Sequence, residues 1–205
     1  TKKWFFDILP SRPPPYVGES LGGYFLRLAD ENSYPKLWGF IRELFPQWDE
    51  ADHIVMLKWE YPLRGWGEIP LLTNLAIDKL SPLTILPWVE KFRKFPGDSY
   101  SLAQGNFFRS LINPHLRVCP SCLNIQPFIR LIWRLLPVTV CVEHGCFLQE
   151  KCSSCGHKLI PIGQASHHMC CTKCGFDLRH LSANPVPQNV LEIQASKQED
   201  FHFLL

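Results

Sequence analysis

The chain has 205 residues, of which 46% are hydrophobic and 13% aromatic, and its formal net charge is +2. This composition is typical of folded globular proteins and excludes a largely disordered chain. There is no run of about 18 apolar residues to span a bilayer, and the N-terminal apolar stretch ends too early, at Asp7, for a signal peptide. We therefore expect a cytoplasmic protein with no membrane contact.

Two predicted helices follow a proline-rich segment at residues 10–15, which should be extended. Apolar residues recur at helical spacing over residues 21–28, and Ser20 is suited to cap that helix. A second apolar face spans residues 37–45, with Pro35 in its first turn. Two short helices joined by a polar turn are typical of a helix-turn-helix unit, but also of any all-α core.

Helical patterns continue further along the chain. Residues 70–80 predict a third helix, and Ser81-Pro82 predicts the start of a fourth, which Pro87 is able to split. Glycine and polar residues between 97 and 106 indicate a connector. We therefore expect a mainly α N-terminal domain with a helix-turn-helix, residues 1–105.

All nine cysteines lie between residues 119 and 174. Seven of these cysteines and one histidine form four pairs, each with two residues between its members. This spacing lets a tight turn direct both side chains of a pair at one ion. An odd cysteine count in a chain without a recognisable signal favours metal binding over disulfides. Thiolates with one imidazole suit two structural Zn²⁺ ions better than iron–sulfur clusters. The predicted ligands are Cys119, Cys122, Cys141, His144, Cys152, Cys155, Cys171 and Cys174.

Sequential pairing of these pairs closes the shortest loops and is favoured for its lower entropy cost. It predicts a Cys₃His site from the first four ligands and a Cys₄ site from the last four. An interleaved arrangement, first pair with third and second with fourth, is also allowed. The sites belong to small α+β zinc-ribbon-like modules at residues 106–150 and 151–181, followed by a C-terminal tail, residues 182–205.

Two cysteines remain outside these pairs. Cys146 is a substitute ligand if the His144 imidazole points away, and Cys170 is able to exchange with Cys171; as the alternative, both are buried apolar side chains. Each site already has four protein ligands, so no position stays open for a catalytic water. Glu143 is the one nearby carboxylate, and we expect it at the surface. The pattern predicts no enzyme.

Basic residues are concentrated in the cysteine-rich part of the chain. Residues 109–180 carry 8 Lys/Arg and 3 Asp/Glu, but seven thiolates and two Zn²⁺ would reduce this region's net charge from +5 to +2. That is too little to infer binding to a polyanion from charge alone. Any nucleic-acid contact needs a local patch, for which the candidates are Arg109, Arg117, Arg130, Arg134, Lys151, Lys158, Lys173 and Arg179.

Several segments together resemble a known family. The first cysteine pair at 119–122 is followed by Arg130-x-x-Trp133, by Val140-Cys-Val-Glu-His144 and by the pair at 152–155, and near the N-terminus Tyr16-Val-Gly-Glu-Ser-Leu21 precedes a helix that carries Arg27. Over residues 14–180 this set resembles the TniQ proteins of bacterial transposons. From the residues alone, Trp133 is expected to pack over the first site, and Arg130 to donate structural hydrogen bonds.

The resemblance implies a function. TniQ proteins act as adaptors in target-site selection, and in CRISPR-associated transposons they connect an RNA-guided Cas effector, with its guide RNA and target DNA, to the AAA+ regulator TnsC. The length is similar to the short TniQ of type V-K systems. We expect a non-enzymatic adaptor of this kind. The alternative is a sequence-specific DNA-binding protein that reads a transposon target site, or a regulator, using its helix-turn-helix.

Overall fold

The computed structural model describes most of the chain. The described residues are 8–34, 36–46, 49, 57–58, 60, 66–91, 110–161 and 169–204. The predicted connector, the boundary after residue 105 and Arg109 lie outside them. The division into domains therefore stays a prediction.

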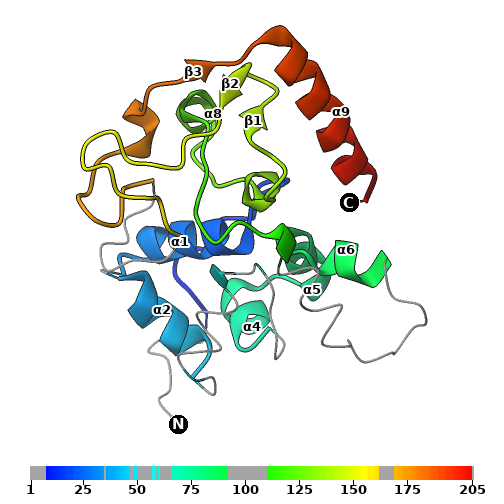
Figure 1. The fold of residues 1–205 in the computed structure, drawn as a ribbon. Coiled ribbons are helices and arrows are strands. Elements are labelled where there is room, and N and C mark those ends of the chain that lie inside the picture. Colours follow the sequence, from blue (N-terminus) through cyan, green and yellow to red (C-terminus); the bar gives the residue numbers. More distant parts are fainter. Residues whose placement is uncertain are drawn as a thin grey trace.

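The molecule has two layers, visible in Figure 1 as a lower and an upper half. The lower layer is helical, and the upper layer contains a short helix, a small sheet and long irregular segments, with a C-terminal helix along one side. The helices of the lower layer are α1 (Leu21–Glu31), α2 (Leu37–Leu44), α4 (Ile69–Thr73), α5 (Ile77–Leu80) and α6 (Leu86–Lys91).

The first helix begins as its sequence predicts, whereas α2 begins at Leu37 and Pro35, predicted in its first turn, lies outside the described residues. Ser20 caps α1, and its Oγ accepts a hydrogen bond of 3.0 Å from the Gly23 N–H, which satisfies one of the free donors of the first turn. Every residue of α1 from Leu21 to Ala29 is buried. The apolar side of α2 packs against it, with Phe25 and Phe45 in an edge-on contact of 6.1 Å between ring centroids.

The single helix predicted over residues 70–80 is wrong. Asn74 adopts a left-handed conformation with φ of 55°, which ends α4, and α5 begins only at Ile77. The Thr73 hydroxyl also donates to the Ile69 carbonyl at 2.6 Å, a bond typical of a helix end. Ser81 starts a 3₁₀ turn, and Pro87 lies in the first turn of α6, where its missing N–H costs nothing, and does not split a helix.

The upper layer has its own core. It contains α8 (Pro120–Ile125), 3₁₀ turns at Leu131–Arg134 and Leu178–His180, and an antiparallel sheet in the order β1-β2-β3. The strands are β1 (Val140–Cys141), β2 (Cys146–Phe147) and β3 (Asn184–Pro185). Buried cysteines pack there among aliphatic side chains. A helical region joined to a small sheet with cysteine-rich modules is the predicted fold class, which is confirmed.

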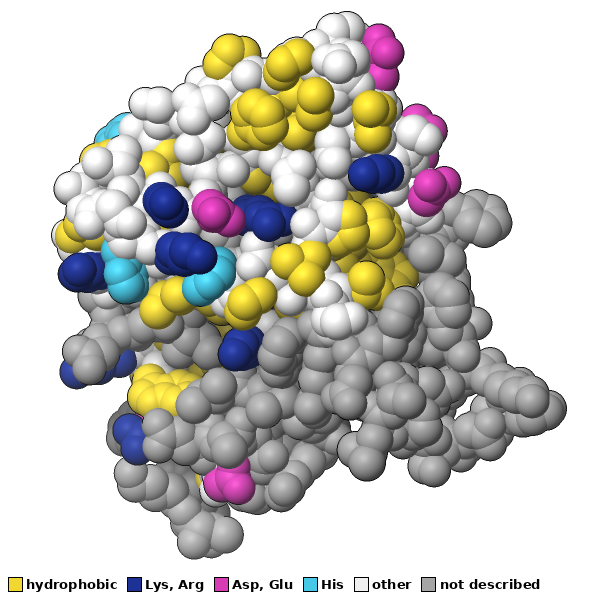
Figure 2. Space-filling model, viewed as in Figure 1, with side chains coloured by type: hydrophobic (Ala, Val, Ile, Leu, Met, Phe, Trp, Pro, Cys, Tyr) yellow, Lys and Arg dark blue, Asp and Glu magenta, His cyan; other side chains and the backbone are white. Residues whose placement is uncertain are grey.

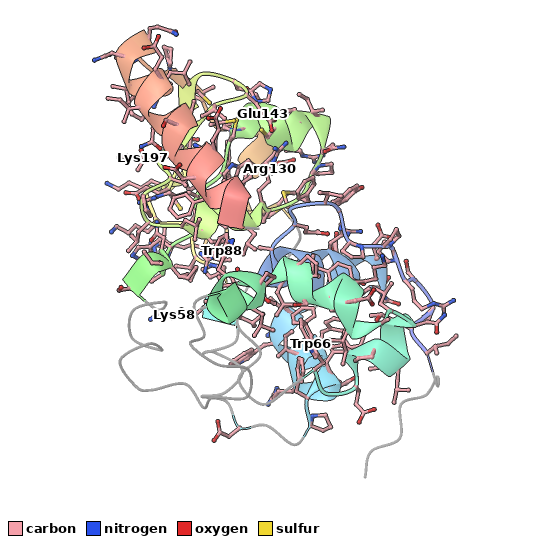
Figure 3. All side chains as sticks on the ribbon, turned by 90° about the vertical axis from the view of Figure 1, so that its right-hand side faces the viewer. Lys58, Trp66, Trp88, Arg130, Glu143 and Lys197 are labelled. Carbon is pink, nitrogen blue, oxygen red and sulfur yellow. The ribbon has the colours of Figure 1, made fainter. Side chains whose placement is uncertain are left out.

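The C-terminal segment, predicted as a tail, forms α9 (Gln188–Leu204). Two glutamine side chains attach it to β1: Gln194 Oε1 accepts from the Thr139 N–H, and Gln198 Nε2 donates to the Val140 carbonyl at 2.9 Å. Its far end reaches the lower layer, where Phe201 contacts Trp88 of α6. Figure 3 shows Trp88 below the end of this helix. No helix in the described parts of the chain is long and apolar enough to cross a membrane.

Candidate metal centres

Four donor atoms converge in the first cluster. Cys119 precedes α8, Cys122 lies in its first turn, Cys141 ends β1, and His144 lies in the turn to β2; their ligand atoms are all within 4.8 Å of one another. The Sγ atoms of Cys122 and Cys141 are 3.5 Å apart, and His144 Nδ1 lies 3.2–3.7 Å from the three sulfurs. A tetrahedron with metal–sulfur bonds of ~2.3 Å has edges of ~3.8 Å, so these residues fit a Zn²⁺ ion.

Local structure explains how the first pair is held. Pro120 occupies the first turn of α8, where its fixed φ favours the helix and its missing N–H costs nothing. Cys119 is the N-cap, and its Sγ accepts from the Cys122 N–H at 3.5 Å. A backbone donor to the sulfur stabilises a thiolate and orients it.

The second cluster is built from two similar turns. Its donor atoms come from Cys152, Cys155, Cys171 and Cys174, and again lie within 4.8 Å of one another. Sulfur–sulfur distances of 3.6 Å for Cys152–Cys174 and 3.8 Å for Cys155–Cys171 match the edges of a tetrahedral site.

Each of these turns closes in the same way. The Gly156 N–H donates to the Cys152 carbonyl and the Gly175 N–H to the Cys171 carbonyl, both at 2.9 Å. Both glycines have positive φ, 69° and 75°, a conformation that glycine adopts without steric cost. In the second turn a backbone N–H from Phe176 lowers the pKa of Cys174 to about 7, which favours the thiolate that a metal requires.

The eight predicted ligands are therefore grouped as sequential pairing predicts, and not in the interleaved arrangement. In the first cluster the cysteine side chains hydrogen-bond to one another. The bond between Cys119 and Cys122 lowers the pKa of Cys119 and raises the pKa of Cys122. Several adjacent thiolates repel one another unless a cation lies between them. That a metal ion binds at each cluster remains our prediction.

The two unassigned cysteines differ in their surroundings. Cys146 is buried on β2, and its Sγ lies 3.6 Å from Cys119 Sγ. The His144 imidazole points into the cluster, so Cys146 is not needed to replace it in this arrangement. Cys170 is half-buried, and its backbone forms an isolated antiparallel β-bridge with that of Asp177.

Arg130 and Glu143 connect the family-like segments to the first cluster. Their side chains form an ion pair, and Figure 3 shows both beside the upper end of the molecule. Glu143 is about half exposed, as predicted, and its Oε2 lies 3.6 Å from Cys122 Sγ. The Arg130 guanidinium stands 5.5 Å from the centroid of the Trp133 ring, which is buried in the same core as Cys119. Arg130 thus donates a hydrogen bond within the chain and Trp133 is buried in the core; that their roles are purely structural remains a prediction.

Arg134 is not a surface residue, which corrects its place among the candidates for a nucleic-acid patch. Its side chain is 0% exposed, and its Nε donates to Glu60 Oε1 at 2.9 Å. Two backbone carbonyls, of His115 and Lys58, accept its remaining bonds. The sequence pattern did not predict the burial of Arg134, because its partner Glu60 lies in a segment without clear apolar periodicity.

Of the remaining described candidates for a nucleic-acid patch, Arg117 and Arg179 have partners within the chain. Arg117 donates to the carbonyls of Leu136 and Val138, and Arg179 pairs with Asp177. Lys151, Lys158 and Lys173 are exposed. In Figure 2, Lys, Arg and His side chains gather on one side of the visible face, with apolar side chains between them.

The N-terminal segment of the resemblance and the segment that carries Arg130 are adjacent in space. The Ser20 N–H donates to the Ile129 carbonyl and the Leu131 N–H to the Gly18 carbonyl, both at 2.8 Å. Next to this bridge, Arg27 forms a buried ion pair of 2.6 Å with Glu19. The N-terminal segment therefore contacts the insert between the two halves of the first cluster.

A helical layer is joined to a second layer that contains two clusters of four donor atoms. This arrangement defines a zinc-ribbon-like protein with a helical N-terminal region. A comparison with protein-family models matches residues 10–148 to TniQ. This is more than half of the chain, and the chain belongs to the TniQ family, whose members are generally non-catalytic transposition proteins. No curated protein matches the sequence.

Proposed function

We propose that this chain is a non-enzymatic adaptor in transposon target-site selection, and that each cluster holds one structural Zn²⁺. The observation that carries the proposal is the TniQ match over residues 10–148, which includes the whole first cluster. A transposition protein that supplies no chemistry acts through the molecules it brings together.

The donor sets support a structural role for the metal. Each cluster offers four protein ligands, whereas catalytic zinc sites have three and leave the fourth position to water or substrate. The zinc would contribute charge to a tetrahedral thiolate site and fix the loops around it. The residues that would hold it are Cys119, Cys122, Cys141 and His144, and Cys152, Cys155, Cys171 and Cys174.

The proposed partners are the AAA+ regulator TnsC and an RNA-guided Cas effector with its guide RNA and target DNA. This assignment rests on the resemblance to TniQ proteins, which in CRISPR-associated transposons connect these partners. Two layers joined by buried contacts suit an adaptor, because such contacts would keep partners on different layers at one distance. The Glu60–Arg134 pair and the 18–20 to 129–131 bridge supply such contacts.

The DNA-reading alternative depends on the helix pair α1 and α2. A reading helix needs several side chains that reach base edges. Residues 21–29 of α1 are buried, so only α2 is available, and its exposed charged residues are Arg42 and Glu43. Glu43 also accepts a hydrogen bond from the Tyr34 hydroxyl. These features favour the adaptor.

The decisive experiment is capture of the chain by TnsC. Purified chain is added to TnsC with ATP and DNA, with and without the effector–guide RNA–target complex, and a gel shift across a salt series is run with the chain alone. We expect capture by TnsC that increases with the effector. No capture in either condition contradicts the adaptor, and tight sequence-dependent DNA binding by the chain alone supports the reader.

A further inference from the structure

Beside its four predicted ligands, the first cluster has a fifth cysteine or histidine side chain. Cys146 is the fifth, and its place follows from the sheet. In the register of β1 and β2, Cys146 stands directly opposite Cys141. Directly opposite residues of an antiparallel pair project to the same face, so both cysteines face the cluster.

The sulfur of Cys146 lies beside one of the four predicted ligands. It lies 3.6 Å from Cys119 Sγ, about one edge of the tetrahedron that a zinc ion would occupy. The side chain is 2% exposed and packs in the same core as Cys119, Cys122 and Cys141. His144, in contrast, is only half-buried and lies in the turn between the strands. The buried thiol therefore lies beside Cys119, while the ligand nearest to solvent is His144.

We propose that Cys146 is a reserve ligand of the first cluster. When the bond from His144 to the metal breaks, the Cys146 thiol releases its proton to solvent, and its sulfur forms the fourth bond. The site changes from Cys₃His to Cys₄ without losing its ion. This rests on the proposed metal binding and adds a ligand exchange at the same site.

The chemistry of the ion favours such an exchange. Zn²⁺ has no geometric preference from d-electrons and accepts both imidazole and thiolate in tetrahedral sites. The exchange needs no movement of α8, since Cys119 and Cys122 stay bound. The movement falls on the β1–β2 turn, where Gly145 has a φ of 56° and separates His144 from Cys146.

The test uses the full chain loaded with Co²⁺, which takes the place of zinc and reports its ligands by absorption. Metal content and thiolate-to-cobalt charge-transfer absorption are measured for wild type, His144→Ala, His144→Ala/Cys146→Ser and Cys146→Ser. His144→Ala/Cys170→Ser is the matched control, because Cys170 is the other cysteine outside the two clusters.

We expect His144→Ala to keep two ions per chain with a higher charge-transfer absorption, because the first site gains a fourth thiolate. The Cys146→Ser double variant should keep one ion, and the Cys170→Ser control should match His144→Ala. One ion in His144→Ala, two ions in the Cys146→Ser double variant, or no gain in absorption each overturns the proposal. The proposal is also overturned if the His144→Ala variant unfolds while the Cys146→Ser variant folds. Fewer than two ions in wild type contradicts metal binding itself.

Discussion

Arg134 and Glu60 form a buried ion pair between the two layers of the molecule. The guanidinium Nε lies 2.9 Å from the carboxylate, and the two side chains are 0% and 1% exposed. Glu60 also accepts a hydrogen bond from the Gly22 N–H of α1 at 2.9 Å. One carboxylate thus connects the start of the helical layer to the 3₁₀ turn of the cysteine-rich layer.

Removing one member of this pair should destabilise the fold strongly. Arg134→Met leaves the Glu60 carboxylate buried without its cation, and we expect a loss of about 3–5 kcal/mol in the free energy of unfolding. Glu60→Gln/Arg134→Met should lose less, because no unpaired charge remains. Denaturant titration measures both. Arg179→Gln, which breaks an exposed pair, is the control and should change stability far less than Arg134→Met. Equal losses for Arg134→Met and the control would contradict the role of the buried pair.

The close contact between α1 and Ile129 gives a second prediction. A Cβ at Gly23 would meet the Ile129 Cβ at 2.8 Å, so Gly23→Ala should destabilise the chain by about 1–3 kcal/mol. Gly39 in α2 has nothing within 4 Å of an added Cβ, and Gly39→Ala should stabilise it by about 0.5–1 kcal/mol because alanine favours helices. Thermal unfolding of the two variants should give shifts of opposite sign. A stabilising Gly23→Ala would show that the two segments are not packed this closely.

The Arg130–Glu143 pair should support metal binding at the first cluster. Arg130 restrains Glu143, which lies between the ligands Cys141 and His144, so Arg130→Gln should weaken metal affinity at this cluster about 10–100-fold, as other supporting residues do. Competition with a coloured chelator measures the metal affinity of the weakened site. Arg179→Gln, next to the second cluster, is the matched control. Unchanged affinity in Arg130→Gln would limit that residue to packing.

Metal removal should unfold the cysteine-rich part first. Structural zinc contributes about 10–16 kcal/mol in isolated finger peptides, so a strong chelator should release two ions per chain and expose residues 119–174. Metal analysis and hydrogen exchange read by mass spectrometry follow both events. Cys152→Ser should lose one ion, whereas Cys170→Ser should keep both. Full exchange protection after complete metal loss would contradict a structural role.

Local patterns in the sequence determined a large part of this molecule. Ser20 caps α1 because its hydroxyl reaches an N–H three residues away, and each cysteine pair meets because two intervening residues form a tight turn. These relationships involve neighbours along the chain, so their spacing is sufficient to predict them. The break at Asn74 was missed because a single residue with positive φ leaves the apolar pattern unchanged.

Only the tertiary structure decided the relationships between distant residues. Arg134 is buried because Glu60, 74 positions earlier, lies against it, and nothing in the local sequence distinguishes it from a surface arginine. Cys146 lies beside Cys119 because the β1–β2 register and α8 meet in one core. The spacing of the cysteines therefore predicted which side chains gather in the two clusters. The packing of the layers determined what surrounds these clusters, including the additional cysteine, Cys146, beside the first cluster.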